Sequence, residues 1–490
     1  MSFDNDSRVV IGKKAFFQAA FIIFILMMIT GIFSIILPSG QYQRKIDSYG
    51  RTIIVADSFT YVQKPDYPIF RWFTAPFEVL FPLRNAALIT IILFILFVGG
   101  AVSLLEKSEV MADLIGRLVK KFRYKKYLLM AILIFLFMFL SSFLGIYEGL
   151  VPLIIFIVPL AHSLGWDSLT GLGISLLPLS FGFAAAVTNP FTIAVAQSIA
   201  DLPLFSGAWL RIIFFVVVYT AVYLFVSSYA RKIEVDPKKS PTYQMDKGLM
   251  ETVNDVVEWE EKHPGMRKAL FFFSCCMVSA MASIIIVSVM SAFFNVPNIT
   301  QIAFPLMGML FFIGGVGSAF FARMRLNDII KTFFAGWVAM SPGIVLILMA
   351  YSIKHIIDQS MITDTILNMS SNLISSAPPI GAAFLVYAVT LVMNFFIGSA
   401  SAKAFLMMPI LTPLADLVGI TRQTAVLAFD FGDGFSNMVF PSNALLLIAL
   451  SFTVVSYPQW IRYTFKLQLF MLAVSSLFLA FAVSISYGPF

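Results

Sequence analysis

Residues 394–443 read NFFIGSASAKAFLMMPILTPLADLVGITRQTAVLAFDFGDGFSNMVFPSN, an apolar stretch with small and polar residues near both ends. The earlier stretch 141–190 repeats this order, with SSFLGIYEG first, then PLAHSLG, and finally VTNPF. In both, a small-residue patch is followed by Pro-Leu-Ala, a glycine turn, an apolar run and a break that holds an asparagine. Paired interruptions of this kind are the best sequence indication of the binding site in a secondary transporter.

The two stretches keep one constant spacing, although few of their residues are identical. The matched pairs are Pro159 with Pro413, Gly165 with Gly419, Thr170 with Thr424, Phe181 with Phe435 and Asn189 with Asn443. A shared order of features at a fixed spacing indicates an internal repeat, and repeats of this kind are common among transporter folds.

The composition excludes a soluble domain. Of the 490 residues 59% are hydrophobic and 12% are charged, whereas about a quarter of a soluble domain is charged. Many apolar runs approach the roughly 20 residues that cross a lipid bilayer. The sequence therefore predicts an all-α polytopic membrane protein. The net charge of +7 comes from basic residues in short loops, which predicts a cytoplasmic N-terminus in a cell inner membrane and no binding to nucleic acid.

Other function classes find little support. Cys275 and Cys276 are adjacent in an apolar run, where packing is their expected role. The three histidines are far apart, so no metal site is predicted. There is no nucleotide-binding motif, and the turn Gly398-Ser-Ala-Ser lacks a nearby histidine base. We expect no enzyme and no cofactor, with Na⁺ or H⁺ as the candidate coupling ions.

The chain divides into two halves joined by a hydrophilic segment. The predicted parts are a first half at 1–229, a cytoplasmic linker at 230–266 and a second half at 267–490. Each half contains an interrupted apolar pair and then one long broken span. These are a hairpin at 127–164 and a broken helix at 168–200, then a hairpin at 382–418 and a broken helix at 421–450. Each pair is either a re-entrant hairpin or two full spans. Loop charge and the count of crossings predict opposite orientations for the halves.

The breaks supply the candidate site. Irregular backbone inside a bilayer is tolerated only where protein or a water-filled cavity covers it. Freed N–H groups and half-helix N-termini suit carboxylates, and freed carbonyls suit cations. The candidate substrate-binding residues in the first half are Ser141, Ser142, Gly145, Thr188, Asn189 and Pro190, and those in the second half are Ser399, Ser401, Asn437, Ser442 and Asn443. The alternative for the small residues is that they only let helices pack closely.

Four ionisable residues, Glu148, Lys403, Asp430 and Asp433, lie in or beside the breaks. A charge in hydrocarbon costs at least ~2.5–3.5 kcal/mol, so such a residue normally faces a cavity or a partner. Glu148 could contact a substrate ammonium and Lys403 a substrate carboxylate, or the two could pair with each other or snorkel. The two aspartates could bind a cation, carry protons or contact a guanidinium. His355, near the end of its span, is expected to snorkel.

Three segments resemble a known family. Residues 398–437, GSASAKAFLMMPILTPLADLVGITRQTAVLAFDFGDGFSN, resemble the signature of YfcC-type membrane proteins in the DcuC-like family, as do NPFTIAVAQSIADLPLFSG at 189–207 and SMITDTILN at 360–368. That family includes C4-dicarboxylate carriers and arginine/ornithine exchangers, and it resembles the ion-transporter superfamily. The resemblance implies two inverted repeats, each with a re-entrant hairpin and a discontinuous helix, an elevator-like transport domain, and a homodimer. Asp430 stands where a neutral polar residue such as Gln is expected.

The expected function is secondary transport of a small amino or carboxylic acid. Three acidic groups against one lysine favour a cationic substrate, so a basic amino acid in arginine/ornithine-type exchange is our first hypothesis. A C4-dicarboxylate is the alternative. A channel is a third possibility, but it would need a polar ring along a pore, whereas these polar groups gather at two breaks.

Overall fold

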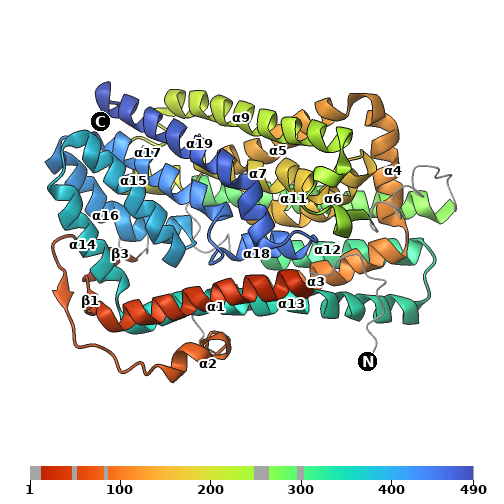
Figure 1. The fold of residues 1–490 in the computed structure, drawn as a ribbon, viewed down its shortest axis with the longest axis horizontal. Helices are drawn as coiled ribbons and strands as arrows, with labels where there is room; N and C mark the ends of the chain where they lie inside the picture. Colours follow the sequence, from red (N-terminus) through yellow and green to blue (C-terminus); the bar gives the residue numbers. More distant parts are fainter. Residues whose placement is uncertain (1–12, 47–51, 82–85, 248–263, 295–302, 489–490) are drawn as a thin grey trace.

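The computed structural model describes residues 13–46, 52–81, 86–247, 264–294 and 303–488. Within these ranges nine helices are long and apolar enough to cross a membrane. Most long helices run roughly parallel to one another across Figure 1. Because helices satisfy their own backbone groups, they are suited to hydrocarbon. The predicted all-α polytopic class is confirmed.

Most helices of one bundle lie along the lower side of Figure 1. Its helices are α1 (Lys13–Ile36), α3 (Ala86–Lys107), α11 (Pro264–Phe294), α12 (Ala303–Phe321) and α13 (Leu326–Ser360). Helix α3 packs against α12 and α13, α11 packs against α12, and α1 packs along α13. Close approach depends on glycine, because a Cβ on Gly315 of α12 would lie 2.8 Å from the Ala101 Cα of α3. We call this group the first bundle.

The segment after α1 forms a small covering structure, whose strands contact α14 (Thr363–Ser375) and α16 (Ala400–Val418) and whose helix packs on α13. It contains the antiparallel pairs β1 (Gly40–Gln41) with β4 (Thr60–Tyr61) and β2 (Arg44–Ile46) with β3 (Thr52–Ile54), followed by α2 (Phe70–Glu78). The sequence did not predict these strands. His355 Nε2 lies 3.2 Å from Glu78 Oε2, and the His355 side chain is only 9% exposed. His355 therefore has a carboxylate partner in α2, and the expectation that it snorkels stays a prediction.

The other bundle contains both predicted hairpins and both broken helices. Its first-half members are α5 (Lys126–Leu144), α6 (Ile154–Ser163), α7 (Ser168–Ala184), α8 (Ile193–Ile199) and α9 (Ala208–Val235). Its second-half members are α15 (Pro379–Phe396), α16 (Ala400–Val418), α17 (Arg422–Phe435), α18 (Ala444–Ser451) and α19 (Tyr457–Ser484). Helices α5, α6 and α9 pack on α7, while α15, α16 and α19 pack on α17. We call this group the second bundle.

The repeat predicted from the sequence extends to local geometry. Gly165 and Gly419 end α6 and α16 with φ of +84° and +75°, a conformation that suits glycine. Asp167 then caps α7 by accepting the Thr170 N–H at 2.8 Å. Thr421 caps α17 by accepting the Thr424 N–H at 3.1 Å. The same turn and cap therefore start both broken helices, and the opposite orientation of the halves stays a prediction.

Two shorter amphipathic helices precede the hairpins. They are α4 (Val110–Phe122), which packs on α6 and α11, and α14 (Thr363–Ser375), which packs on α15 and α16. Figure 1 places α4 and α14 at opposite ends of the molecule. Residues 248–263 of the predicted linker lie outside the described residues.

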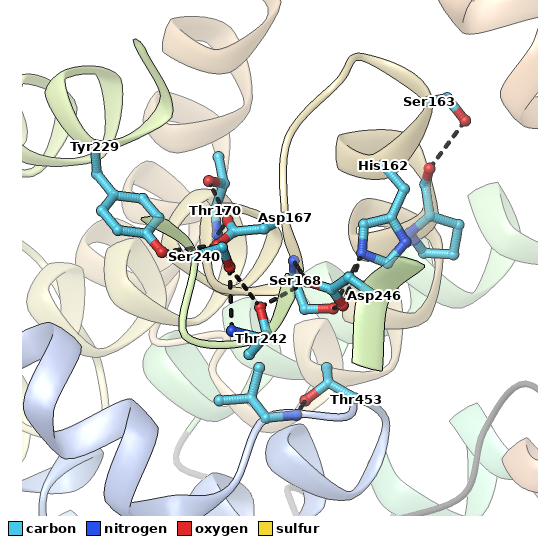
Figure 2. Close-up of polar contacts among 12 residues, drawn as sticks. His162, Ser163, Asp167, Ser168, Thr170, Tyr229, Ser240, Thr242, Asp246 and Thr453 are labelled. Atoms are coloured by element: carbon cyan, nitrogen blue, oxygen red, sulfur yellow. Dashed lines mark hydrogen bonds and ion pairs between the residues drawn. The ribbon is translucent and has the colours of Figure 1, made fainter. Parts of the chain in front are cut away.

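A polar cluster closes the start of α7 (Figure 2). The chain after α9 turns back, so that Ser240 donates to Asp167 at 2.6 Å and Asp246 accepts from the Ser168 hydroxyl at 2.5 Å. Burial alone would raise the pKa of Asp246, but contacts with His162, Ser168 and Thr242 outweigh it and lower that pKa. The described part of the predicted linker is thus not a loose tether, since it fastens α9 to the start of the first broken helix.

Candidate functional site

The two helix breaks lie side by side in the second bundle. The rings of Phe181 and Phe435, which the repeat predicts to be equivalent, stand 5.6 Å apart. A Cβ on Gly434 would lie 2.1 Å from the Ala184 Cα, so α7 and α17 touch through their backbones just before each helix ends. Glycine permits an approach that any side chain would prevent. The two interruptions therefore converge, as the sequence predicts for a shared site.

The first break runs from Ala185 to Thr192 and is fastened to the tip of α5. Ser142 donates to the Ala185 carbonyl at 2.5 Å, and Thr188 donates to the Phe143 carbonyl at 2.9 Å. Ser141 donates instead to the Leu179 carbonyl of α7 at 2.7 Å. Of the three acceptors, the Ala185 carbonyl belongs to the break itself, and the other two lie inside α7 and at the end of α5. All three hydroxyl-bearing residues lie in or beside the break, and their hydrogen bonds fix it against α5.

Asn189 organises the centre of the first break. Its Oδ1 accepts the N–H of Phe191 at 2.8 Å and that of Thr192 at 3.3 Å. A Cβ on Gly145, which has φ of +67°, would lie 2.5 Å from this oxygen. Gly145 is therefore required both by its backbone conformation and by the close approach of Asn189. Pro190 lies buried in the same turn.

Asn443 repeats this arrangement in the second break. Its Oδ1 accepts the Leu445 N–H at 2.9 Å, two residues ahead, as Asn189 does with Phe191. Its amide donates to Asn437 Oδ1 at 2.9 Å. Both asparagines thus form the same side-chain turn before the second part of a broken helix.

A buried ion pair sits between the second hairpin and the second break. The Lys403 ammonium of α16 donates to Asp433 Oδ1 of α17 and to Asn394 Oδ1 of α15. The side chains of Lys403 and Asp433 are 0% and 1% exposed. The Asn394 amide in turn donates to Ser436 Oγ at 2.7 Å and to Asn437 Oδ1 at 3.0 Å. Lys403 therefore has an acidic partner within the protein, as a buried charge requires.

The remaining serines lie at the edge of the same region. Ser401 donates to the Phe191 carbonyl at 2.9 Å and so links the second hairpin to the first break. Ser399 caps α16 by accepting the Ala402 N–H at 3.4 Å. Among the described residues, the buried hydroxyl of Ser442 has no hydrogen-bond partner. Ser442 precedes Asn443 and the N-terminus of α18, where a carboxylate would be favoured.

Asp430 differs from Asp433 in that both of its oxygens lack a partner among the described residues, whereas Asp433 lacks one only at Oδ2. The Asp430 side chain is buried, with 1% of the residue exposed. Thr192 and the Ala186 backbone lie beside it without reaching hydrogen-bond geometry. Arg211, also 1% exposed, attracts it through space. An ionised carboxylate without hydrogen bonds is costly to bury, so Asp430 is the acid of this region with the greatest unmet bonding capacity.

Arg211 itself is occupied by other acceptors. Its guanidinium donates to the carbonyls of Val187 at 3.2 Å, Ser206 at 2.9 Å and Phe205 at 3.2 Å. A longer bond of 3.4 Å reaches the Tyr487 hydroxyl. The sequence analysis did not select Arg211, although it is a charge inside an apolar run. Nor did it select Asn394 or Thr192, which are single polar residues among apolar neighbours.

The side chain of Glu148 lies outside the described residues. Its backbone begins the short 3₁₀ segment Glu148–Leu153 after the tip of α5. A role for this carboxylate, and its proposed pairing with Lys403, therefore stay predictions. Every other predicted site residue lies in or beside one of the two breaks.

These observations define the class of protein. A multi-pass helical protein whose two broken helices meet around buried polar and charged side chains is a membrane transporter and not an enzyme. The family model described as "DcuC: C4-dicarboxylate anaerobic carrier" matches residues 17–484. The chain belongs to this family.

Relatives of known sequence agree with that assignment. The chain is 30% identical over 470 residues to the "Putative basic amino acid antiporter YfcC" of Escherichia coli (strain K12), covering 90% of this chain and 91% of that protein. It is 25% identical over 401 residues to a protein of Haemophilus influenzae described as uncharacterized, covering 81% and 76% of the two chains. The resemblance to YfcC-type proteins is confirmed.

Two solved transporter structures also align with the chain. The first is YdaH of Alcanivorax borkumensis, with 18% identity and a TM-score of 0.42, and the alignment covers 97% of this chain and 100% of YdaH. The second is MtrF of Neisseria gonorrhoeae, with 17% identity and a TM-score of 0.43, and the alignment covers 95% of each chain. Both TM-scores lie below 0.5, so neither likeness defines the arrangement of this chain.

Proposed function

We propose that this protein is a secondary active transporter of the inner membrane whose substrate is a basic amino acid, exchanged in the manner of arginine for ornithine. The similarity to a relative described as a basic amino acid antiporter supports this choice. The basic loops predicted from the sequence support an N-terminus in the cytoplasm. A homodimer is an expectation from the superfamily resemblance, which light scattering of the purified protein would test.

One observation carries the choice of a cationic substrate. Both buried cations of the site are held by protein acceptors: Lys403 by Asp433 and Asn394, and Arg211 by carbonyl groups. In the part of the chain that the structure describes, both oxygens of the acid Asp430 are unpartnered. A group with unmet hydrogen bonds favours the ligand that satisfies it. That ligand is a guanidinium or an ammonium.

The substrate carboxylate and α-amino group need separate partners. The Ser442 hydroxyl and the N-terminus of α18 offer donors for a carboxylate beside the second break. Glu148, at the tip of the first hairpin, is our candidate partner for the α-amino group. These assignments place the α-carboxylate at the second break, the α-amino group at the tip of the first hairpin and the cationic side chain at Asp430, so that a substrate must carry all three groups to engage every partner.

A C4-dicarboxylate is the second candidate, and the family description favours it. Such a substrate would need two sets of donors. Within the described residues it would have to take Lys403 or Arg211 away from their present acceptors. Removing one partner of a buried pair costs about 3–5 kcal/mol, which weakens this alternative.

The two bundles support an elevator-type mechanism of alternating access. The second bundle holds both hairpins, both broken helices and the whole candidate site, and the first bundle holds none of them. We propose that the second bundle moves as a unit against the first. The polar cluster at the start of α7 would keep α9 attached during that movement.

Proteoliposomes test the proposed function directly. Uptake of labelled arginine should rise when ornithine is enclosed, and it should saturate with concentration. Carriage of succinate without arginine would refute the cationic assignment, and ohmic, unsaturated current would indicate a channel. Asn443→Ala should abolish exchange while the protein remains folded, because it frees the turn before α18. Asn372→Ala, on the exposed face of α14, is the matched control and should retain exchange.

A further inference from the structure

We propose that Asp430 carries the coupling proton and that the proton and the cationic end of the substrate occupy this carboxylate in turn. This inference rests on the proposed function and extends it to the coupling ion. In the empty site the carboxyl is protonated. When a guanidinium or ammonium binds, the O–H bond breaks, the carboxylate pairs with the cation, and the proton leaves to the water on the open side.

The first argument is the bonding state of Asp430. It is 1% exposed and, within the described residues, makes no hydrogen bond through either oxygen. An isolated buried carboxylate is so poorly solvated that it takes up a proton unless a cation replaces water. A protonated carboxyl needs far less from its surroundings. Asp430 therefore needs either a proton or a positively charged ligand, and binding of the substrate replaces the first by the second.

The second argument is the contrast with Asp433, one helical turn away. Asp433 is bound by the Lys403 ammonium, and the Asn394 amide donates to its backbone carbonyl at 3.0 Å. Its charge is therefore compensated in every state that keeps this contact. Two acids whose surroundings differ in this way take different roles. Asp433 keeps the second break in place, and Asp430 is the exchangeable group.

The charged and titratable groups around Asp430 are compatible with this exchange. On its own helix it faces Asp433, whose charge opposes a second anion. From α9 it faces Arg211, and from the end of the chain Tyr487, both electrostatically coupled to it. From α16, Lys403 is already engaged by Asp433. Thr192, at the start of α8, offers a hydroxyl that has no partner in the described chain. The positive charge of Arg211 lowers the free-energy cost of ionising Asp430, which allows the proton to leave.

The third argument concerns sodium, the other candidate ion. A sodium ion in such a site would be held by carbonyls that the helix breaks release. In the first break those of Ala185, Val187 and Phe191 already accept from Ser142, Arg211 and Ser401. A proton needs only the carboxylate. One lone pair of each of these carbonyls is thus already used, which makes the first break a poorer sodium site and favours a proton.

Isothermal titration of the purified full chain with arginine tests the inference. In buffers of different ionisation enthalpy, binding should release about one proton per arginine. The apparent Kd should rise about tenfold per pH unit on the acid side. Asp430→Asn should lose both the proton release and the pH dependence, and Asp430→Glu should retain them. Asp416→Asn, a surface acid on α16 that is 48% exposed, should behave as wild type.

The outcomes separate this inference from the proposed function. Arginine binding that releases no proton and is independent of pH would overturn proton coupling while leaving basic amino acid transport intact. Arginine binding that requires sodium at constant pH would also overturn it. If Asp430→Asn kept the wild-type pH dependence, another group would carry the proton. If arginine is neither bound nor exchanged, the proposed function itself fails.

Discussion

Removing the charge of Lys403 should strongly destabilise the protein. Lys403→Met leaves Asp433 buried without its ammonium and leaves Asn394 Oδ1 without its donor. Since the two side chains are 0% and 1% exposed, water cannot replace the lost partner. Breaking such a pair typically costs about 3–5 kcal/mol.

A double-mutant cycle measures the pair itself. Asp433→Asn should also destabilise, but the double variant should lose much less than the sum, because it contains no uncompensated charge. We expect a coupling of about 2–4 kcal/mol from equilibrium unfolding in mixed detergent micelles, followed by tryptophan fluorescence. The control pair is Lys126 with Glu234, whose atoms lie 2.9 Å apart but whose side chains are 29% and 26% exposed. Its coupling should stay within about 1 kcal/mol.

Equal couplings for the two pairs would refute the reasoning. So would a Lys403→Met variant with wild-type stability at neutral pH. Either result would mean that water reaches Lys403 and Asp433, and the assignment of different roles to Asp433 and Asp430 would lose its basis.

Two further predictions concern other parts of the fold. Gly434→Ala should destabilise the protein by about 1–3 kcal/mol and impair exchange, because the new Cβ would lie 2.1 Å from the Ala184 Cα. Gly308→Ala is the control and should be tolerated, because the nearest atom to its Cβ would be 3.4 Å away. Similar unfolding midpoints for the two variants would contradict the close crossing of α7 and α17. Burial alone would raise the pKa of Glu78, but hydrogen bonds, chiefly from Arg71, lower it to about 2. Because the folded pKa is depressed, the stability that Glu78 contributes is present above about pH 4.5 and is lost as pH falls toward 2. Glu78→Gln should remove that part of the pH dependence, and unchanged acid titration of unfolding would argue against it.

Much of the fold was accessible from the sequence because its signals are local. Helices α7 and α17 each begin at a capping residue and each end at a break that follows a glycine. The residues that determine each helix end therefore lie within about two turns of it. The asparagines at 189 and 443 were selected from their position alone, and both form the same turn. The predicted boundaries 168–200 and 421–450 agree closely with the helices found. The predicted first half ends at 229, whereas α9 continues to Val235.

The partners of the charged residues were not accessible, because they depend on tertiary contacts. Nothing near Lys403 indicates that its ammonium meets Asp433 thirty positions later, or that Asn394 joins them. Arg211 could have been noticed by the rule that selected Asp430, since both are charges in apolar runs. Its acceptors, however, are carbonyls whose position depends on the turn at Phe205 and Ser206. A sequence pattern marks a buried charge and does not identify what neutralises it.

The two halves of the repeat share a backbone but differ in chemistry. In the first break the described side chains are neutral, and their hydrogen bonds return to the backbone. In the second, Lys403, Asp430 and Asp433 stand at positions whose first-half counterparts carry no charge. Under the proposed function, the equivalent asparagines set the shape of the site and the charges of the second half select the cationic end of the substrate. Changes at Asp430 should consequently alter the choice of cation, and changes at the neutral residues of the first break should affect folding and exchange of all substrates alike.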